Sequence, residues 1–276
     1  MKTLRLIIRI ILLAFLVFLA CGLDCRMKIR HYNIESGKIK SDIRIALVSD
    51  LHSCYYGKGE RRIIKQIDKF HPDLIFLIGD IYDDEKPMDI TTEFFNNIGN
   101  RYSCWYVVGN HEVKSGNLDT MKTMIKNSGT RYLENEKTMV KVRQDTINLC
   151  GVVDVTQLLN WNLVRAAVDS VSRLCDTTRY TILLHHRPEL IEIFMESPFD
   201  MVTAGHYHGG QFRLPWIKEG VYAPDHAGEL KYTGGLYPFG NDRYAVVSRG
   251  LSRESTRIPR FFNRPELVFV TIHPKQ

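Results

Sequence analysis

The first half of the chain alternates short apolar runs with an amphipathic segment. Three runs, each ending on polar residues, cover 43–50 (IRIALVSD), 73–80 (DLIFLIGD) and 102–110 (YSCWYVVGN). Between the first two, residues 60–70 repeat apolar side chains at helical spacing. Continuous apolar runs rich in β-branched residues are typical of strands buried on both faces, and the intervening period is typical of a covering helix. The pattern predicts parallel strand–helix–strand units.

The second half adds more strands. Residues 138–154 alternate like a hairpin that turns at Gln144 and Asp145, and residues 157–174 have the spacing of one long amphipathic helix. Further strands are expected at 180–186, 200–208, 243–250 and 266–273, with room for one more within 26–42. No linker, repeat or low-complexity tract divides the chain. We therefore expect one mixed α/β domain with a sheet-on-sheet core and outer helices.

The amino-terminal segment has a different character. Basic residues reach Arg9, and an uncharged apolar run follows from Ile10 to Leu23. Fourteen residues are fewer than the roughly 20 that span a bilayer, but counting from Leu6, with Arg9 at the interface, gives a marginal span. We expect residues 1–26 to be an anchor. The alternatives are a cleaved signal segment, a lipoprotein signal ending at Cys21, or a buried core helix.

Charge supports this division of the chain. Residues 1–40 carry eight Lys/Arg and two Asp/Glu, whereas the remainder holds 29 of each sign. A nucleic-acid-binding domain would carry the basic excess itself, so that class is disfavoured. Basic residues before an apolar span stay in the cytoplasm, which puts residues 27–276 outside the cell membrane. The six cysteines show no paired metal or redox spacing outside the anchor region, and the sequence does not set their disulfide state.

Polar residues gather where five of the expected strands end. They are Asp50 and His52, Asp80, Asn110 and His111, His185 and His186, and finally His206 and His208. Taken singly, each has an ordinary explanation, since Asp often caps a helix and Gly-Asn or Gly-Asp often forms a turn. The carboxyl ends of parallel strands share one edge of a sheet, where ligands bind. Five coincidences of this kind therefore favour a common site.

The chemistry of this set indicates metal ions. Imidazole, carboxylate and amide groups without a thiolate suit Mn, Fe, Zn or Mg better than a structural zinc site. From this set the five strand ends can bring two Asp, one Asn and four His to one place, and these seven ligands are too many for one ion but suit two ions that share a carboxylate. Such a pair stabilises both the attacking and the leaving oxygen in a phosphoryl displacement.

The same residues carry a family resemblance. Asp-x-His, Gly-Asp, Gly-Asn-His-Glu, a late His before Pro, and Gly-His-x-His, in that order, resemble the calcineurin-like metallophosphoesterases over residues 43–273. The stretches GHYHGGQ and RFFNRPEL are similar to the bacterial membrane-associated branch, some of whose members hydrolyse UDP-2,3-diacylglucosamine or related membrane-surface phosphates. The resemblance implies a four-layer αββα sandwich, two β-sheets flanked by helices, and attack on phosphorus by a metal-activated hydroxide.

The resemblance also implies a role for each residue. Asp50, His52 and His208 would hold one divalent ion, with Asp80 bridging to a second ion on Asn110, His186 and His206. His111 matches the histidine that contacts the phosphate or protonates the leaving group, so His111 and Asp80 are the catalytic candidates. His185 competes with His186 as the ligand, and Asp83 is expected in a supporting or turn role, with a direct role as the alternative. Gly209 and Gly210 would let the histidine loop turn tightly.

Substrate contacts are less well specified. Arg187 would bind a substrate anion or form a structural ion pair, and Tyr55 and His185 are further candidates. Trp216, Tyr237 and Phe239 would rim the site or touch the membrane. The expected substrate is a lipid-linked or surface phosphate ester or pyrophosphate, because the anchor holds the site near the bilayer. The alternative substrate is a soluble phosphate ester. A non-catalytic metal-binding scaffold is the alternative function, and it is much less favoured because the metal-binding set is complete.

Overall fold

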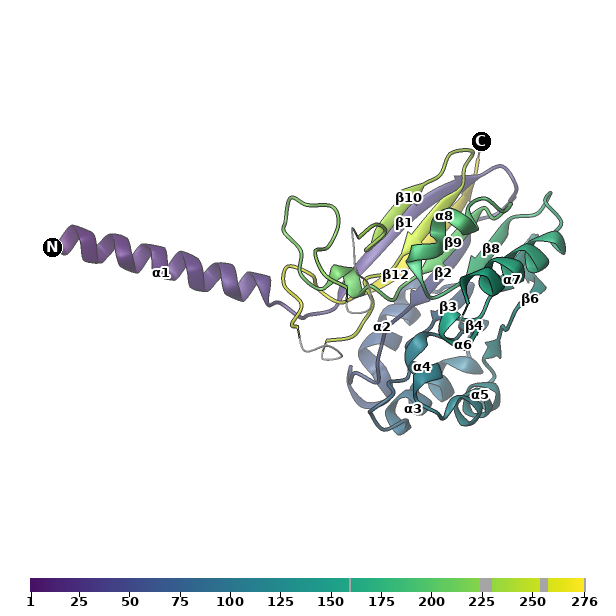
Figure 1. Ribbon diagram of the computed structural model, residues 1–276, viewed down its shortest axis with the longest axis horizontal. Helices are drawn as coiled ribbons and strands as arrows, with labels where there is room; N and C mark the ends of the chain where they lie inside the picture. The colour runs from purple at the N-terminus through teal and green to yellow at the C-terminus, as the bar shows by residue number, and fades with distance from the viewer. Residues whose placement is uncertain (159, 224–229, 254–257, 276) are drawn as a thin grey trace.

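Two six-stranded β-sheets face each other in the computed structural model (Figure 1), which describes residues 1–158, 160–223, 230–253 and 258–275. In spatial order, the first sheet comprises β1 (Lys28–Ser36), β12 (Glu266–Pro274), β2 (Ile43–Val48), β3 (Leu74–Ile78), β4 (Cys104–Val107) and β5 (Arg131–Tyr132). The second comprises β10 (Gly235–Pro238), β11 (Tyr244–Val247), β9 (Met201–Ala204), β8 (Thr181–Leu184), β7 (Asp145–Gly151) and β6 (Glu136–Val142).

Strand direction follows the sequence pattern. Strands β2 to β5 are mutually parallel and consecutive, as the strand–helix–strand pattern predicts. Strands β6 and β7 form the expected antiparallel hairpin, with Val142 opposite Asp145. Strands β7, β8 and β9 are parallel, so their carboxyl ends share one edge of the second sheet. Strand β10, which the sequence pattern does not indicate, pairs with β11 at the sheet margin.

Alternating side chains bury both faces of the central strands. In β2, Ile45 and Leu47 join the apolar cluster between the two sheets, whereas Ala46 and Val48 join the cluster beneath the outer helices. A strand covered on both sides needs no polar face, which explains its continuous apolar run. Burying one such Ile or Leu side chain stabilises the fold by about 1.5–3 kcal/mol.

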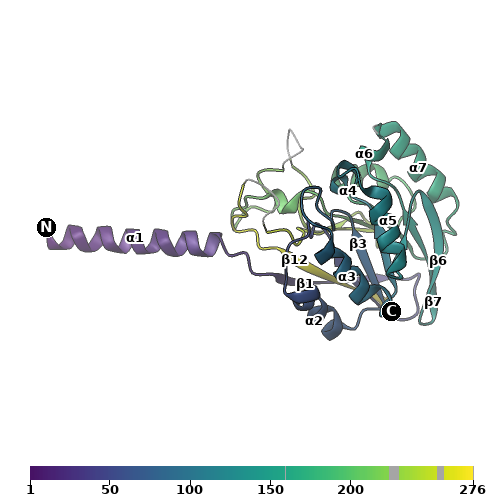
Figure 2. The same ribbon diagram turned by 90° about the horizontal axis from the view of Figure 1, so that it is seen from below.

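Helices cover the outer face of each sheet, giving the predicted four-layer αββα sandwich (Figure 2). The first sheet is covered by α2 (Arg61–Phe70), α3 (Asp89–Gly99) and α5 (Leu118–Asn127). The second is covered by α7 (Trp161–Arg173) and α8 (Ile191–Phe194). The shorter helices are α4 (Asn110–Lys114), α6 (Val155–Leu158) and the 3₁₀ turns η1 (Lys58–Glu60), η2 (Pro188–Leu190) and η3 (His208–Gly210).

The expectation of one helix over 157–174 is wrong. The segment forms two helices, with α6 ending at Leu158 and α7 beginning at Trp161. Asn160 lies between them in an extended conformation, and its side chain accepts a hydrogen bond from the backbone N–H of Asn162. An Asn that caps the start of a helix in this way is favoured there over the helix interior, which explains the break.

Helix α1 (Lys2–Gly22) projects away from the sandwich (Figure 1). Its 21 residues rise about 32 Å, close to the ~30 Å hydrocarbon core of a bilayer. It is long and apolar enough to cross a membrane, and its most apolar stretch is not buried against the domain. The buried core helix is therefore wrong, whereas a cleaved signal or a lipoprotein signal has the same properties as an anchor.

Candidate metal centre

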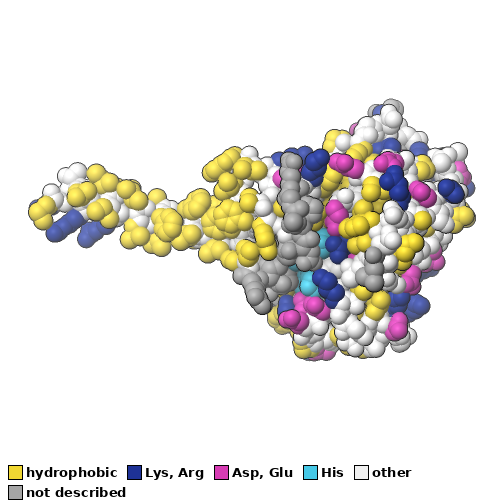
Figure 3. Space-filling view, in the orientation of Figure 1, with side chains coloured by type: hydrophobic (Ala, Val, Ile, Leu, Met, Phe, Trp, Pro, Cys, Tyr) yellow, Lys and Arg dark blue, Asp and Glu magenta, His cyan; other side chains and the backbone are white. Residues whose placement is uncertain are grey.

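The carboxyl ends of five strands, three from one sheet and two from the other, deliver side chains to one edge of the sandwich. They are Asp50 and His52 after β2, Asp80 after β3, Asn110 and His111 after β4, His186 after β8, and His206 and His208 after β9. All of them are buried except His111, which is partly exposed. In Figure 3 histidine side chains reach the surface near Lys and Arg side chains.

Two groups of side chains share Asp80. The first is Asp50, His52, Asp80 and His208, and the second is Asp80, His186 and His206. Within each group, the ligand atoms all lie within 4.8 Å of one another. Asp80 Oδ2 lies 3.0 Å from His186 Nε2 and 3.7 Å from His52 Nε2. One carboxylate therefore stands between two sets of imidazoles, as a bridging ligand requires.

The backbone at these positions is strained. Left-handed φ values occur at Asp50 (48°), His52 (49°), Asp80 (52°), His206 (68°) and His208 (48°). Residues with a Cβ atom adopt this region infrequently, at a cost of about 1–3 kcal/mol each. Such strain persists where the surrounding fold imposes it, and it concentrates at functional sites. The sharp turns aim consecutive side chains at the same point.

Glycines allow the loops to approach one another. A Cβ atom on Gly109 would lie 2.6 Å from the backbone nitrogen of Asp80, and one on Gly79 would lie 2.6 Å from His186 Nδ1. The expected tight turn after the last histidine is present, with φ of 72° at Gly209 and 68° at Gly210. Side chains at these glycines would push the carboxylate and imidazoles apart.

Neighbouring groups orient two of the imidazole rings. His186 donates from Nδ1 to the backbone oxygen of Ile78 at 2.7 Å, and His52 Nδ1 lies 3.2 Å from Asp83 Oδ2. Each contact directs the Nε2 atom of the ring toward Asp80. Asp83 therefore contacts His52 as a supporting residue would. Its carboxylate also forms a third candidate metal group with His52 and His111, so the direct role remains its alternative.

Buried polar atoms at the centre fit divalent ions. Among the residues that the structure describes, both side-chain polar atoms of Asn110 are buried without a hydrogen-bond partner, and Asp80 Oδ2 and His186 Nε2 are buried with only each other at 3.0 Å. Leaving such groups unpaired costs about 1–3 kcal/mol each. Nitrogen and oxygen donors of this kind are the ligands that Mn, Fe, Zn or Mg prefer. The donor set therefore fits divalent ions.

Protons compete with metal ions for the ligand atoms of Asp80 and the histidines. Burial lowers the pKa of His186, but the Asp80 carboxylate outweighs it and raises that pKa to about 10. The pKa of Asp80 is correspondingly held well below its usual value, because the charges of His186 and His52 outweigh the effect of burial. Burial lowers the pKa of His208 to about 4, which keeps that ring neutral. Metal binding at this centre would therefore release a proton.

His111 lies at the rim of the centre. Its backbone N–H donates to Asp80 Oδ1 at 2.8 Å, and its Nδ1 lies 2.6 Å from Asp84 Oδ1. Burial lowers the pKa of His111, but Asp80 and the hydrogen bond to Asp84 raise it more. The side chain is 26% exposed and its ring lies 4.4 Å from the ring of His52, so the imidazole borders both the centre and solvent.

Arg187 touches the centre but is held by carboxylates. Its Nη1 lies 3.0 Å from His206 Nε2, its Nε donates to Asp154 at 2.9 Å, and Nη1 also pairs with Glu189 at 3.0 Å. The pKa of His206 is lowered well below its usual value by burial and then by Arg187. The structural ion pair expected as one of two roles for Arg187 is present.

Two other substrate candidates lie apart from the metal groups. His185 is fully buried, and its ring packs edge-on against Phe194 at 4.7 Å. Tyr55 is 55% exposed, and its carbonyl accepts a hydrogen bond from Arg253. His185 belongs to none of the described groups of metal-ligand atoms. Of the late His pair, His186 is the one that faces the centre.

The aromatic residues expected at the rim of the site or at the membrane differ in exposure. Trp216 is 77% exposed. Tyr237 is buried in β10 with its hydroxyl on Glu219, and Phe239 packs against the core beneath α7 and α8. The expectation of a surface role is wrong for Tyr237, because the pairing of β10 with β11, not indicated by the sequence, draws it into the core. Phe239 stays half-buried.

Comparison with known proteins identifies the family to which this site geometry belongs. Residues 43–245 match the family model described as Calcineurin-like phosphoesterase. The chain belongs to that family. As a family member it is a metal-dependent phosphoesterase, a hydrolase of phosphate esters, and its buried Asp/His cluster agrees with a dinuclear divalent metal site.

This phosphoesterase has several bacterial relatives. An uncharacterized metallophosphoesterase of Campylobacter jejuni (Cj0846) is 25% identical over 100% of this chain and 73% of its own length. One from Helicobacter pylori is 27% identical over 91% of this chain and 65% of its own. Phosphodiesterase YaeI of Escherichia coli is 26% identical over 65% of this chain and 63% of its own. The solved structure of Haemophilus influenzae NAD nucleotidase aligns with 77% of this chain and over 46% of its own chain, with 13% sequence identity and a TM-score of 0.49.

Sequence reasoning about the phosphoesterase missed several supporting residues. Glu112 is buried, and its carboxylate accepts hydrogen bonds from the backbone nitrogens of Asp80, Ile81, Tyr82 and Gly109. Burial raises the pKa of Glu112 to about 7. The Gly-Asn-His-Glu motif contains this residue, but spacing alone does not show that its side chain turns back onto the backbone. Asp84 and Asp154 were missed in the same way.

Proposed function

We propose that the chain is a membrane-anchored phosphohydrolase with two divalent ions. Asp50, His52 and His208 would hold one ion, Asn110, His186 and His206 would hold the other, and both would share Asp80. The observation that carries this proposal is the sharing of Asp80 by two buried groups of ligand atoms. The unpartnered buried amide of Asn110 supports it.

The ions and the chain have separate tasks. The ions supply Lewis-acid chemistry, which neutralises phosphate charge and lowers the pKa of the attacking water. His111 donates a proton or hydrogen bond to a phosphate oxygen or to the leaving group, and Asp84 holds its ring in place. Asp83 orients His52, and Arg187 keeps His206 neutral and positioned.

The anchor guides the choice of substrate class. We assign α1 as an uncleaved span with its basic end in the cytoplasm, which puts the catalytic domain outside the cell membrane. A site tethered there favours a lipid-linked or surface phosphate ester or pyrophosphate. A soluble phosphodiester is the second candidate, favoured by the name of the E. coli relative. Cleavage of residues 1–26, or lipoprotein processing at Cys21, is the alternative to the anchor.

The test uses the full chain in detergent micelles, treated with EDTA and then supplied with Mn²⁺, Mg²⁺ or Zn²⁺. Hydrolysis of bis-p-nitrophenyl phosphate, p-nitrophenyl phosphate and a lipid-linked pyrophosphate is compared. We expect activity that disappears with EDTA and returns with metal, with the lipid substrate turned over fastest. A preference for the soluble diester would select the second candidate. No turnover of any substrate with two ions bound would overturn the hydrolase assignment.

The anchor has its own test, independent of catalysis. Membranes that contain the full chain are washed with alkaline carbonate, and the mass of the retained chain is measured. We expect an intact chain in the pellet. Release into the supernatant, or a mass lacking residues 1–26, would overturn the uncleaved anchor and leave the metal centre unaffected.

A further inference from the structure

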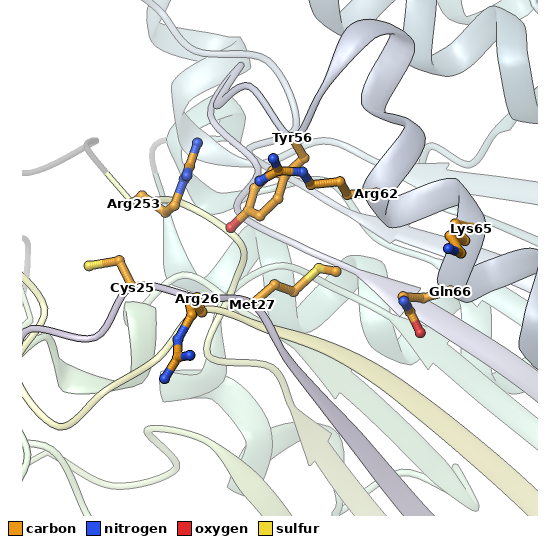
Figure 4. A pocket seen from close by; sticks show the side chains of 8 residues that line it. All are labelled: Cys25, Arg26, Met27, Tyr56, Arg62, Lys65, Gln66 and Arg253. Carbon is orange, nitrogen blue, oxygen red and sulfur yellow. The ribbon is translucent and has the colours of Figure 1, made fainter. Parts of the chain in front are cut away.

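A cationic pocket lies where the chain leaves α1 (Figure 4). Its volume is 490 Å³, and it is lined by Cys25, Arg26, Met27, Tyr56, Arg62, Lys65, Gln66 and Arg253. These residues come from three parts of the chain: the segment after α1, the segment leading into and along α2, and the loop after β11. Four of the eight are basic and none is acidic.

Two of the four basic side chains, Arg62 and Lys65, make no ion pair within the described part of the chain. Arg26 pairs with Asp24 at 2.9 Å, and Arg253 lies over the ring of Tyr56 at 4.7 Å. Arg62 and Lys65 are exposed on α2, and within the described part of the chain neither has an ion-pair partner. The pocket is therefore short of negative charge and offers guanidinium and ammonium donors, which suit a phosphate group.

The pocket lies at headgroup depth if α1 spans the bilayer. The helix ends at Gly22, and Cys25 follows three residues later, at most about 10 Å along the chain. Headgroups occupy roughly 5–8 Å on each side of the hydrocarbon core. Arg26 and its neighbours therefore come level with lipid phosphates.

An apolar surface beside the end of α1 supports the same orientation (Figure 3). The ring of Phe18 packs on Phe262 at 5.0 Å, and the backbone N–H of Phe262 donates to the oxygen of Gly22 at 2.6 Å. Phe261 stacks on Phe212 at 4.8 Å, at the start of a loop that leads to Trp216. The exposed apolar residues of this loop are Phe212, Trp216, Ile217, Val221 and Tyr222. Aromatic and apolar side chains beside a span are typical of the membrane interface.

We propose that this pocket binds the phosphate of an anionic phospholipid headgroup in the leaflet where α1 ends. This inference rests on the proposed anchor. Basic side chains at an anionic surface and apolar side chains beside the span have one partner in common, which is the bilayer. The bound lipid fixes the domain against the membrane, so that the metal centre keeps a constant orientation to substrates in the same leaflet.

The test is native mass spectrometry of the full chain, released from micelles containing equal amounts of dioleoyl phosphatidylglycerol and dioleoyl phosphatidylcholine. We expect selective retention of phosphatidylglycerol. In the double variant R62Q/K65Q retention falls by about 30-fold, the effect of two basic side chains at an anionic surface. The matched control K126Q/K141Q removes two exposed cations from α5 and β6 and should retain the lipid as the wild type does.

Each other outcome has a definite meaning. Equal retention of the two lipids, or equal loss in the control variant, would overturn the pocket assignment. Displacement of the lipid by millimolar glycerol 3-phosphate would show that the pocket takes a soluble phosphate and would also overturn it. Thermal unfolding of R62Q/K65Q should match the wild type, because both positions are exposed. Failure of the anchor would instead appear in the carbonate wash, and failure of catalysis in the ester assay.

Discussion

The Nε2 atoms of His52 and His208 lie 3.1 Å apart, although 156 residues separate them in the chain. One follows β2 in the first sheet and the other follows β9 in the second. The two sheets therefore meet at this pair, and the centre exists only when the sandwich is complete. Behind the rings, Asp83 contacts His52 Nδ1 and Ser252 contacts His208 Nδ1, each at 3.2 Å. Both rings are held from the side that faces away from the centre.

Asp83→Asn should weaken metal binding without unfolding the protein. The carboxylate orients His52, and losing such a support typically lowers metal affinity or activity by 10- to 100-fold, so we expect an effect within about that range. Mn²⁺ affinity is measured by isothermal titration of the EDTA-treated full chain. Asp119→Asn, on the exposed face of α5, is the matched control. Unchanged affinity in the Asp83 variant would show that His52 needs no support.

His111→Gln should keep both ions and lose turnover. His111 is not among the ligands proposed here, and general acid–base catalysis contributes about 10²–10⁴-fold. We expect kcat for a diester to fall by that factor while metal content stays at the wild-type value. His273→Gln, at the far end of β12, is the control. Loss of a metal ion in His111→Gln would instead make this residue a ligand.

Gly109→Ala tests the close approach of two loops. The added methyl group would collide with the backbone and carboxylate of Asp80, so the Asp80 carboxylate must move. A displacement near 1 Å at a catalytic group can cost about 100-fold in rate. Gly37→Ala is the control, because nothing lies within 4 Å of a Cβ atom there. Equal activity of the two variants would remove the steric argument.

Glu60 should make stability depend on pH away from the metal centre. Burial raises the pKa of its carboxyl from 4.5 to about 7, although the Tyr56 backbone N–H opposes this shift. Because the folded pKa lies above the unfolded one, its contribution is most favourable below about pH 4.5 and is lost as the pH rises through 7. Glu60→Gln should raise Tm at pH 8 and not at pH 4. Exposed Glu35→Gln should change neither value, and a gain at both pH values would contradict the titration.

The strand pattern carries most of the fold. The apolar runs around Ile45, Ile75 and Tyr106 correspond to β2, β3 and β4, because strands buried on both faces leave a strong signal. Helices α3 and α5 leave a weaker sequence signal, and neither of them is predicted from the sequence. The break at Asn160 and the edge strand at Tyr237 were missed because each depends on local capping or on pairing with a distant segment.

The residues of the candidate site likewise comprise some that the sequence predicts and some that it does not. Ligand candidates such as Asp80 and His208 follow strands, so topology and a family resemblance together predict that they meet. The left-handed backbone at these residues does not follow from spacing. Supporting groups such as Glu112 and Asp84 act through side-chain direction, which only the folded loops determine. The basic pocket joins Arg26, Arg62 and Arg253 from separate segments and leaves no motif.

The most direct test of the dinuclear centre is the number of metal ions per chain, measured together with hydrolysis, in the wild type, Asp80→Asn and the surface control Asp119→Asn. Our account predicts two ions per chain in the wild type and the control. Asp80→Asn should lose at least one ion and at least about 100-fold in activity, since a bridging ligand should matter no less than a residue that only orients one. Two ions and full activity in Asp80→Asn, or hydrolysis by a wild-type chain without bound metal, would contradict the account.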